Sequence, residues 1–435
     1  MRCISTDGTC PETDLAEALY TGLAPDGSLY MPRQLDPLEE ADLRRLAPLP
    51  LPESATVVAR HLLRDALEPT AVESLIHDTL DFEIPLVPVE EGHYVLELFH
   101  GPTLAFKDVG ARFMARLMRA LQPPSHERLT ILVATSGDTG SAVAHAFAGL
   151  EGFDVAVLFP HGKVSEAQQK LFTTIGGNVR SFAVDGTFDD CQRMVKECFA
   201  DADLRARRPL GSANSINLGR LLPQSFYYLH LLHELTEQGL DPWSIDLRIV
   251  TPSGNFGNLT AGLFARRLGL PCRFVAATNA NDVVPQFLDG RPYQPRPSVR
   301  TLSNAMDVGA PSNFDRILHL YQGDEEALRK DVAGVSVDDE LTLETIAAVF
   351  QRTGYVLDPH TAVGYLALEK AVPPGATGVV LATAHPAKFA NVVERATGRP
   401  VVLPPALADC LDREEFVTAL PPEASALREE LLGTG

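Results

Sequence analysis

The sequence lacks the patterns that mark several large classes of protein. Its six cysteines are scattered and include no Cys-x-x-Cys pair, so we expect reduced thiols and neither a zinc site nor a disulfide framework. It has no apolar run near the roughly 18 residues of a membrane-spanning helix. Its first residues also lack the apolar core of a signal peptide. These absences favour a cytoplasmic protein that works without a membrane.

Positive charge is also scarce in this chain. The 37 Lys and Arg residues are outnumbered by 57 Asp and Glu residues, which gives a formal net charge of −20 at pH 7. Such a surface repels nucleic acid and anionic lipid. We therefore expect a small-molecule partner and no nucleic acid. An anionic substrate would need a local positive pocket, which makes individual Lys and Arg residues informative.

Two glycine-rich turns share one pattern but lack the nucleotide-binding fingerprints. Segments 136–140 and 253–257 both read Ser-Gly-Asp/Asn-x-Gly between an expected strand and an expected helix. Neither has the Lys-Ser/Thr pair of a Walker motif or the G-x-G-x-x-G spacing, which counts against a kinase or a nucleotide-binding oxidoreductase. A glycine-rich loop at a helix amino terminus can hold phosphate or carboxylate through its backbone N–H groups. A tight turn without a ligand is the alternative for either loop.

From about residue 95, short β-branched runs alternate with amphipathic helical runs. The expected strands are 130–134, 155–159, 179–184, 247–250, 273–277 and 378–382. The expected helices are 141–150, 165–175, 188–199, 218–235 and 259–268. This alternation predicts an α/β fold with a largely parallel sheet covered on both faces. Ligands of such sheets bind beyond the carboxyl ends of the strands.

Lys107 is the strongest candidate for a catalytic residue. Apolar residues recur every four positions from Val109 to Leu121, which predicts a helix beginning near Lys107 with Thr103 as a cap. The helix dipole and partial loss of water both favour the neutral amine. That form attacks carbonyls and makes Schiff bases. A surface lysine is the alternative for this stretch taken alone.

The polar segment 212–220 precedes the apolar stripe of an expected helix. It holds two serines, two asparagines and Arg220, whereas capping a helix needs one Ser or Asn. The surplus donors and the guanidinium suit a phosphate group. A capping loop with a surface arginine is the alternative.

Two further segments lie at expected element ends. Thr383 follows the last expected strand, and its hydroxyl could bond a ring nitrogen. His385 and Lys388, in the same turn, are expected to be ordinary loop residues. Segment 358–361 is expected to start a helix, with a supporting role near a site as the alternative. The proline-rich segment 285–297 is expected to be irregular.

Six motifs occur in one order along the chain and together resemble the threonine synthase family. That family comprises pyridoxal-phosphate enzymes of the tryptophan-synthase-β fold type, also called fold type II. The segment GLAPDGSLYMP at 22–32 is also similar to the family's amino-terminal domain. The resemblance implies two open, twisted, largely parallel sheets flanked by helices, plus a small N-terminal domain. The six motifs are HGPTLAFKD at 100–108, ATSGDTGSA at 134–142, SANSIN at 212–217, PSGNFGN at 252–258, SNAMDVG at 303–309 and TAHPAKF at 383–389.

The resemblance implies roles around a pyridoxal 5′-phosphate cofactor. Lys107 would form the Schiff base with the cofactor and then serve as the proton-transferring base. Asp138 would lie near the ring hydroxyl, and Thr383 would meet the pyridine nitrogen. The cofactor phosphate would lie in one loop, formed by Gly254, Asn255, Phe256, Gly257 and Asn258.

The resemblance also implies a substrate site with two anion contacts. Ser136 and Thr139 would hold the substrate carboxylate. Ser215, Asn217 and Arg220 would hold the phosphate of O-phospho-L-homoserine. No metal is implied.

The implied enzyme is a carbon–oxygen lyase acting on phosphates. It would convert O-phospho-L-homoserine and water to L-threonine and phosphate by γ-elimination and β-addition. The alternatives are a lyase acting on another γ-substituted or phosphonate amino acid, and a serine or threonine dehydratase. A dehydratase needs no second phosphate site, so segment 215–220 argues against it. From a different class, a nucleotide-binding oxidoreductase or kinase is disfavoured by the missing fingerprints.

We expect the chain to act as a monomer or homodimer with four parts. These are an N-terminal domain (1–90), a large cofactor-binding domain (91–125 and 216–400), a smaller mobile α/β subdomain (126–215) and a C-terminal tail (401–435). The small subdomain would close over the site, because the reactive intermediates need shelter from water.

Overall fold

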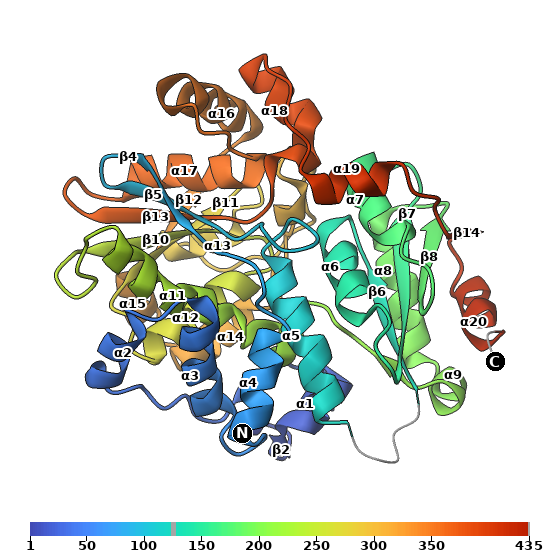
Figure 1. Cartoon of the computed structure of the whole chain (residues 1–435). Helices are drawn as coiled ribbons and strands as arrows, with labels where there is room; N and C mark the ends of the chain where they lie inside the picture. Colours follow the sequence, from blue (N-terminus) through green and yellow to red (C-terminus); the bar gives the residue numbers. More distant parts are fainter. Residues whose placement is uncertain (123–127, 434–435) are drawn as a thin grey trace.

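Two largely parallel sheets, each flanked by helices, form the body of the molecule (Figure 1). The structure is a computed structural model that describes residues 1–122 and 128–433. A third, small antiparallel sheet belongs to the N-terminal segment. This architecture confirms the predicted fold class. Within the described residues, no helix is both long and apolar enough to cross a membrane.

The larger sheet has the strand order β12-β11-β10-β13-β5-β4, and its pairs are parallel except β4 with β5. The strands expected at 247–250, 273–277 and 378–382 are confirmed. Because β5, β13 and β10 are parallel neighbours, the segments that follow them leave from one edge of the sheet. The strands are β4 (Leu86–Glu90), β5 (His93–Glu97), β10 (Leu247–Pro252), β11 (Arg273–Thr278), β12 (Val332–Ser336) and β13 (Thr377–Ala382).

The smaller sheet has the order β14-β8-β7-β6-β9, and all its pairs are parallel. Its edge strand β14 comes from the C-terminal segment, which returns to pair with β8. The predicted domain limits stay predictions, and the limit between 125 and 126 lies outside the described residues. The strands are β6 (Leu129–Ala134), β7 (Phe153–Pro160), β8 (Val179–Val184), β9 (Leu210–Gly211) and β14 (Val417–Leu420).

The N-terminal segment combines a three-stranded antiparallel sheet with four helices. Its helices α2 and α3 pack on α11, and α4 packs on α5. The elements are β1 (Arg2–Ser5), β2 (Thr13–Asp14), β3 (Tyr30–Pro32), α1 (Leu15–Thr21), α2 (Glu40–Leu46), α3 (Leu51–Leu63) and α4 (Pro69–His77).

Sixteen helices and two 3-10 turns follow in the described chain, and α16 and α17 lie across the larger sheet from α11 and α12 (Figure 1). The first eight are α5 (Lys107–Ala120), α6 (Asp138–Phe147), α7 (Glu166–Thr173), α8 (Phe188–Ala200), α9 (Ala202–Arg207), α10 (Leu218–Leu221), α11 (Gln224–Glu237) and α12 (Gly257–Arg267). The rest are α13 (Val283–Leu288), η1 (Asn304–Met306), α14 (Phe314–Leu320), α15 (Glu325–Asp331), α16 (Asp339–Thr353), α17 (Pro359–Ala371), η2 (Pro386–Phe389), α18 (Ala390–Thr397), α19 (Pro405–Leu411) and α20 (Ala424–Leu432).

Three local predictions are wrong, each for a physical reason. The helix expected at 218–235 is two helices, because Pro223 has no N–H to continue α10 and instead precedes α11. The segment expected to be irregular at 285–297 begins inside α13, whose first turn tolerates Pro285. Thr103 does not cap α5; its N–H and hydroxyl donate to the buried Asp108 carboxylate at 2.8 and 2.6 Å.

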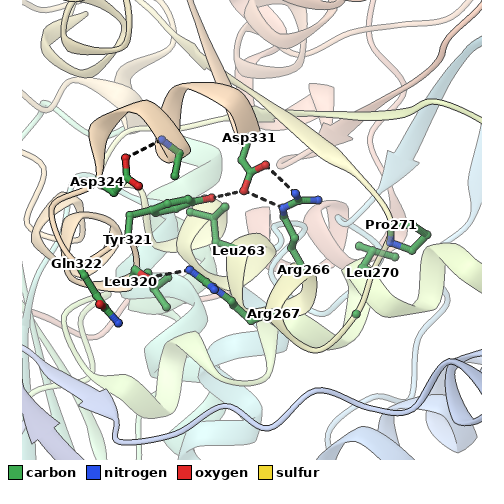
Figure 2. Close-up of a pocket in the computed structure, with 12 residues that line it drawn as sticks. Leu263, Arg266, Arg267, Leu270, Pro271, Leu320, Tyr321, Gln322, Asp324 and Asp331 are labelled. Carbon is green, nitrogen blue, oxygen red and sulfur yellow. Dashed lines mark hydrogen bonds and ion pairs between the residues drawn. The ribbon is translucent and has the colours of Figure 1, made fainter.

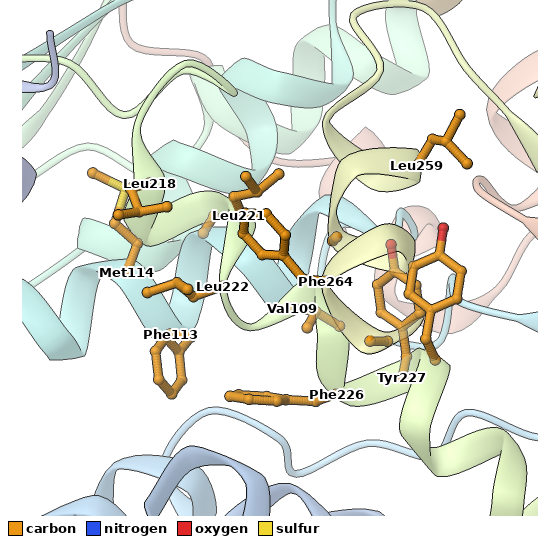
Figure 3. Packing of buried hydrophobic residues seen from close by; sticks show 14 of the residues in the cluster. Val109, Phe113, Met114, Leu218, Leu221, Leu222, Phe226, Tyr227, Leu259 and Phe264 are labelled. Carbon is orange, nitrogen blue, oxygen red and sulfur yellow. The ribbon is translucent and has the colours of Figure 1, made fainter. Parts of the chain in front are cut away.

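Helix α5 is the packing centre that joins the parts of the chain. It packs against α1, α4, α6 and α10. The predicted stripe is confirmed at Val109, Phe113 and Leu117, which are at most 1% exposed, while Leu121 follows the end of α5 and is half-buried. Phe113 meets Phe226 of α11 edge to face, with the ring centroids 5.3 Å apart (Figure 3). The helix that begins at Lys107 is therefore fixed from several sides.

We expect Phe113→Ala to lower the free energy of unfolding by about 3–5 kcal/mol, because it leaves a cavity in this core. Urea denaturation followed by circular dichroism measures the change. Val57→Ala, at a position that is 37% exposed, is the control and should stay within about 0.5 kcal/mol of wild type. A loss below about 1 kcal/mol for Phe113→Ala would contradict this packing.

Candidate active site

Lys107 is the first residue of α5, as predicted, and its backbone is tied to the strand end that carries Thr383. The Phe106 N–H donates to the Thr383 carbonyl at 3.0 Å, and Ala105 forms a β-bridge with Ala384. Leu104 adopts a left-handed φ of 55°, which is uncommon for a non-glycine residue. Backbone strain of this kind gathers at functional sites.

Two lysines share the buried Asp138 carboxylate at the start of α6. Lys388 Nζ lies 2.6 Å from Asp138 Oδ1, and Lys107 Nζ lies 3.5 Å from Oδ2. Gln168 Nε2 also donates to Oδ1, at 2.9 Å. The Lys107 side chain is 14% exposed, while those of Asp138 and Lys388 are 4% and 0% exposed. The expectation that Lys388 is an ordinary loop residue is therefore wrong.

The same cluster sets the charge of Lys107. Burial lowers the pKa of Lys107, and the nearby Lys388 and Arg220 lower it further, while Asp138 opposes them. Burial tends to raise the pKa of Asp138, but the two ammonium groups outweigh it and hold that pKa below its usual range. Asp138 thus stays ionised and gives Lys107 only part of a counter-ion. This arrangement favours a neutral amine at Lys107.

The predicted cofactor loop presents backbone donors that the protein does not use. Within the described residues, the N–H groups of 254–257 donate to no protein acceptor at the start of the 11-residue helix α12. Phe256 takes a left-handed φ of 60°, which turns the chain into the helix. A Cβ on Gly254 would lie 2.7 Å from the Ala305 carbonyl oxygen, so only glycine fits there. Free donors at a helix amino terminus form an anion site.

In the other glycine-rich loop, at 136–140, two of the backbone N–H groups are bonded within the protein. The Thr135 hydroxyl accepts from the Gly137 and Gly140 N–H groups at 2.9 and 2.8 Å. A Cβ on Gly137 would collide with the Gln168 side chain at 2.6 Å, so Gly137 allows Gln168 to reach Asp138. Ser136 and Thr139 are half-buried beside Asp138, and their contact with a substrate stays a prediction.

The predicted cofactor loop and substrate loop meet directly. Asn255 Nδ2 donates to Ser215 Oγ at 2.7 Å, and Asn255 Oδ1 accepts from the Ser312 N–H at 2.6 Å. The fully buried Arg316 holds the segment that carries Ser215, since it donates to the Ile216 carbonyl at 2.6 Å. Burial lowers the pKa of Arg316 to about 9, so it remains cationic at neutral pH.

Two predicted binding residues have their amide groups bonded within the protein. Asn217 caps α10 and donates to the carbonyls of Leu19 and Ser212 at 2.8 and 3.0 Å. Asn258 donates to the Pro252 carbonyl at 2.7 Å and accepts from Ser253 Oγ at 3.1 Å. Both side chains shape their loops.

Arg220 is buried in α10 against α5. Its Nη1 donates to the Ala213 carbonyl at 2.7 Å, while its Nε has no hydrogen-bond partner. Burial lowers the pKa of Arg220 to about 10, so it stays charged at neutral pH. In the part of the chain that the structure describes, neither Arg220 nor Arg316 forms an ion pair with a carboxylate. Two buried cations without carboxylates favour an anionic ligand nearby.

Sequence reasoning missed Arg316 and Gln168 and undervalued Lys388. Lys388 lies in one of the six motifs, so the motif was the available signal. Arg316 follows SNAMDVG by seven residues, and nothing in its local spacing marks it. No group of three or more His, Cys, Asp or Glu in the described residues is placed to hold a metal.

Two surface pockets are present, and neither is lined by Lys107, Asp138 or Lys388. One of about 670 Å³ is lined by α12 and α14–α15 residues, where Arg266 pairs with Asp331 and Tyr321 donates to the same carboxylate (Figure 2). The other, of about 560 Å³, includes Glu97 and His385. The reactive amine and its carboxylate partner therefore belong to the buried cluster and to neither of these pockets.

Comparisons with known proteins agree with this geometry. Residues 83–384 match the family described as "Pyridoxal-phosphate dependent enzyme". Residues 2–80 match "Threonine synthase N terminus", and residues 361–430 match "Threonine synthase, C-terminal". The chain is 44% identical to the threonine synthase of Haemophilus influenzae over 397 residues, which is 91% of each chain. The chain belongs to the threonine synthase family.

Solved structures of threonine synthases have the same fold. The Escherichia coli enzyme aligns with a TM-score of 0.91 at 40% identity, covering 100% of both chains. The PLP-bound threonine synthase of Brucella melitensis aligns with a TM-score of 0.94 at 34% identity, covering 100% of this chain and 99% of that one. The predictions of the family and of pyridoxal phosphate as cofactor are confirmed.

The residues present fit this cofactor. A buried primary amine with a lowered pKa suits its aldehyde, and four unused backbone donors suit its phosphate. The individual site assignments from the sequence stay predictions.

We expect Lys388→Met to raise the pKa of Lys107, because it removes a neighbouring positive charge and leaves Asp138 without that partner. The neutral amine then requires higher pH. Schiff-base formation with added pyridoxal 5′-phosphate, followed by absorbance across a pH series, should need a more alkaline solution. Lys330→Met, at an exposed surface pair, is the control. An unchanged or more acidic profile for Lys388→Met would contradict this role.

Proposed function

We propose that this threonine synthase family member converts O-phospho-L-homoserine and water to L-threonine and phosphate. The observation that carries the proposal is the pair of anion-receiving sites beside one buried amine. One is the set of free donors at 254–257, and the other is the Ser215–Arg220 segment with its buried guanidinium. A phosphorylated substrate and a phosphorylated cofactor require two such sites.

The 254–258 loop would hold the cofactor phosphate. Its four free N–H groups and the dipole of α12 provide donors without a mobile side chain. Asp138 would lie near the ring hydroxyl, and Thr383 would donate to the pyridine nitrogen, since its backbone bond places it beside Lys107. The bound cofactor supplies an electron sink when protons leave the amino-bearing carbon and the carbon next to it.

Lys107 would be the proton-transferring base. Its Nζ would take protons from the substrate Cα and Cβ and return protons to Cγ and Cα. A base must be neutral before it accepts a proton, which is the form that burial and Lys388 favour. Asp138 would keep the amine oriented through its 3.5 Å contact.

The substrate would be held by anion contacts at both ends. Ser136 and Thr139 would bind its carboxylate at the start of α6, where the helix dipole favours an anion. Ser215 and Arg220 would bind its phosphate, and Asn217, whose amide is bonded to the Leu19 and Ser212 carbonyls, would hold the loop that carries Ser215. The Arg220 guanidinium would also stabilise the negative charge of the departing phosphate.

The smaller subdomain would close over the substrate. Asp138 and Gln168 lie in its helices α6 and α7, whereas Lys107 and Lys388 lie in the larger domain. Their ion pairs therefore connect the two predicted domains next to the reacting amine. Closure there would exclude water from the intermediates until it is needed at Cβ.

We expect the protein, supplied with pyridoxal 5′-phosphate, to release threonine and phosphate in equal amounts from O-phospho-L-homoserine. Lys107→Ala should reduce turnover by at least about a thousandfold, because it removes the base. Amino-acid analysis and a phosphate assay measure both products. Lys196→Ala, on the exposed face of α8, is the matched control. Ammonia and a keto acid from serine or threonine as the dominant products would favour a dehydratase instead.

We expect Arg220→Met to raise the KM for O-phospho-L-homoserine by about 10- to 100-fold, because a charged hydrogen bond to phosphate is lost. Cofactor absorbance should remain, since the proposed cofactor loop is separate. Steady-state kinetics over a substrate series measures the change. The matched control is Arg267→Met, which removes an exposed guanidinium bonded to the Leu320 carbonyl. Unchanged KM and turnover would exclude Arg220 from the substrate site.

A further inference from the structure

Two motifs have no role in the proposed reaction, and the structure brings them together. SNAMDVG at 303–309 contains the 3-10 turn η1, and segment 358–361 starts α17. The Ala305 N–H donates to His360 Nε2 at 3.2 Å, and His360 Nδ1 lies 2.6 Å from Asp358 Oδ2. The His360 and Asp358 side chains are only 3% and 0% exposed.

These bonds indicate the tautomer of the imidazole, that is, which ring nitrogen carries the hydrogen. Because Nε2 accepts from a backbone N–H, it cannot carry a proton, so Nδ1 carries one and donates it to Asp358. Asp358 is itself fixed as the cap of α17, where it accepts from the His360 and Thr361 N–H groups at 2.9 and 3.0 Å. His360 therefore connects the Ala305 N–H to the first turn of α17 and holds it in position.

The η1 turn, which is bonded to His360, packs against the 254–257 loop. A Cβ on Gly254 would stand 2.7 Å from the Ala305 carbonyl oxygen and 2.8 Å from Met306 Cα, so the two backbones are in contact. The Met306 and Asp307 N–H groups bond within the turn, to Ser303 and Asn304. The Ala305 N–H depends on His360 instead. Loss of that bond would remove the hydrogen bond that connects the turn beside Gly254 to α17.

We propose that His360 is a positioning residue for the phosphate of pyridoxal 5′-phosphate. It acts through Ala305 and Gly254, so that the free N–H groups of 254–257 keep a fixed direction. This inference rests on the proposed function of the 254–258 loop as the phosphate cradle. Loss of His360 should therefore weaken binding of the cofactor phosphate and leave binding of the aldehyde and ring unchanged.

The test compares the affinities of apo-protein variants for pyridoxal 5′-phosphate and for pyridoxal, which lacks the phosphate. We expect His360→Leu to weaken pyridoxal 5′-phosphate binding about tenfold, as for loss of one hydrogen bond that leaves a donor unpaired. Pyridoxal binding should stay unchanged. His360→Gln, whose amide oxygen can accept from Ala305, should restore most of the lost affinity. His360→Asn, which is too short to reach Ala305, should behave like the leucine variant.

Absorbance titration measures both affinities, and circular dichroism checks each fold. His61→Leu, which removes an imidazole bonded to the Asp36 carbonyl in the N-terminal segment, should change neither affinity. Equal losses for both ligands, no loss in the leucine variant, or a glutamine variant as weak as the asparagine variant would overturn the inference. If the leucine variant does not fold, the glutamine–asparagine pair decides. If the wild-type protein bound both ligands equally, the proposal that the 254–258 loop holds the cofactor phosphate would itself be refuted.

Discussion

The site depends on one buried carboxylate that serves two ammonium groups. Asp138 lies 2.6 Å from Lys388 and 3.5 Å from Lys107, so its charge is mostly committed to Lys388. A full ion pair with Lys107 would favour the protonated amine, and no carboxylate at all would leave Lys388 as an uncompensated buried charge. The unequal sharing satisfies Lys388 and leaves Lys107 able to lose its proton. The same carboxylate joins helices of the two predicted domains.

Much of the fold was predictable because its signals are local. Each expected strand of the two main sheets has its counterpart, since a short β-branched run between turns is sufficient to mark a buried parallel strand. Lys107 at the start of α5 was predictable from the four-residue spacing that follows it. The errors at Pro223 and Pro285 arose where the effect of one proline depends on its place in a helical turn.

The supporting residues of the site were less predictable, because their roles come from contacts between distant segments. The sequence alone indicates a loop lysine at position 388, and only the fold shows that Lys388 pairs with Asp138. Arg316 reads as an ordinary residue of a short helix until its guanidinium reaches the Tyr30 carbonyl in the N-terminal sheet at 2.9 Å. Asn217 shows the opposite case, since its motif predicted a ligand contact and its amide bonds backbone groups. A motif marks the loop, and the packing decides which side chain faces the ligand.

The free donors at the start of α12 connect stability with ligand binding. Backbone N–H groups without an acceptor cost free energy when they are shielded from water, so a loop that carries four of them needs support. Asn255 provides part of it through Ser215 and Ser312, and the η1 turn adds to it by packing against Gly254. An anion that accepts from those donors stabilises the folded state in proportion to its affinity. The contacts that hold the loop in shape would therefore also set how tightly it binds an anion.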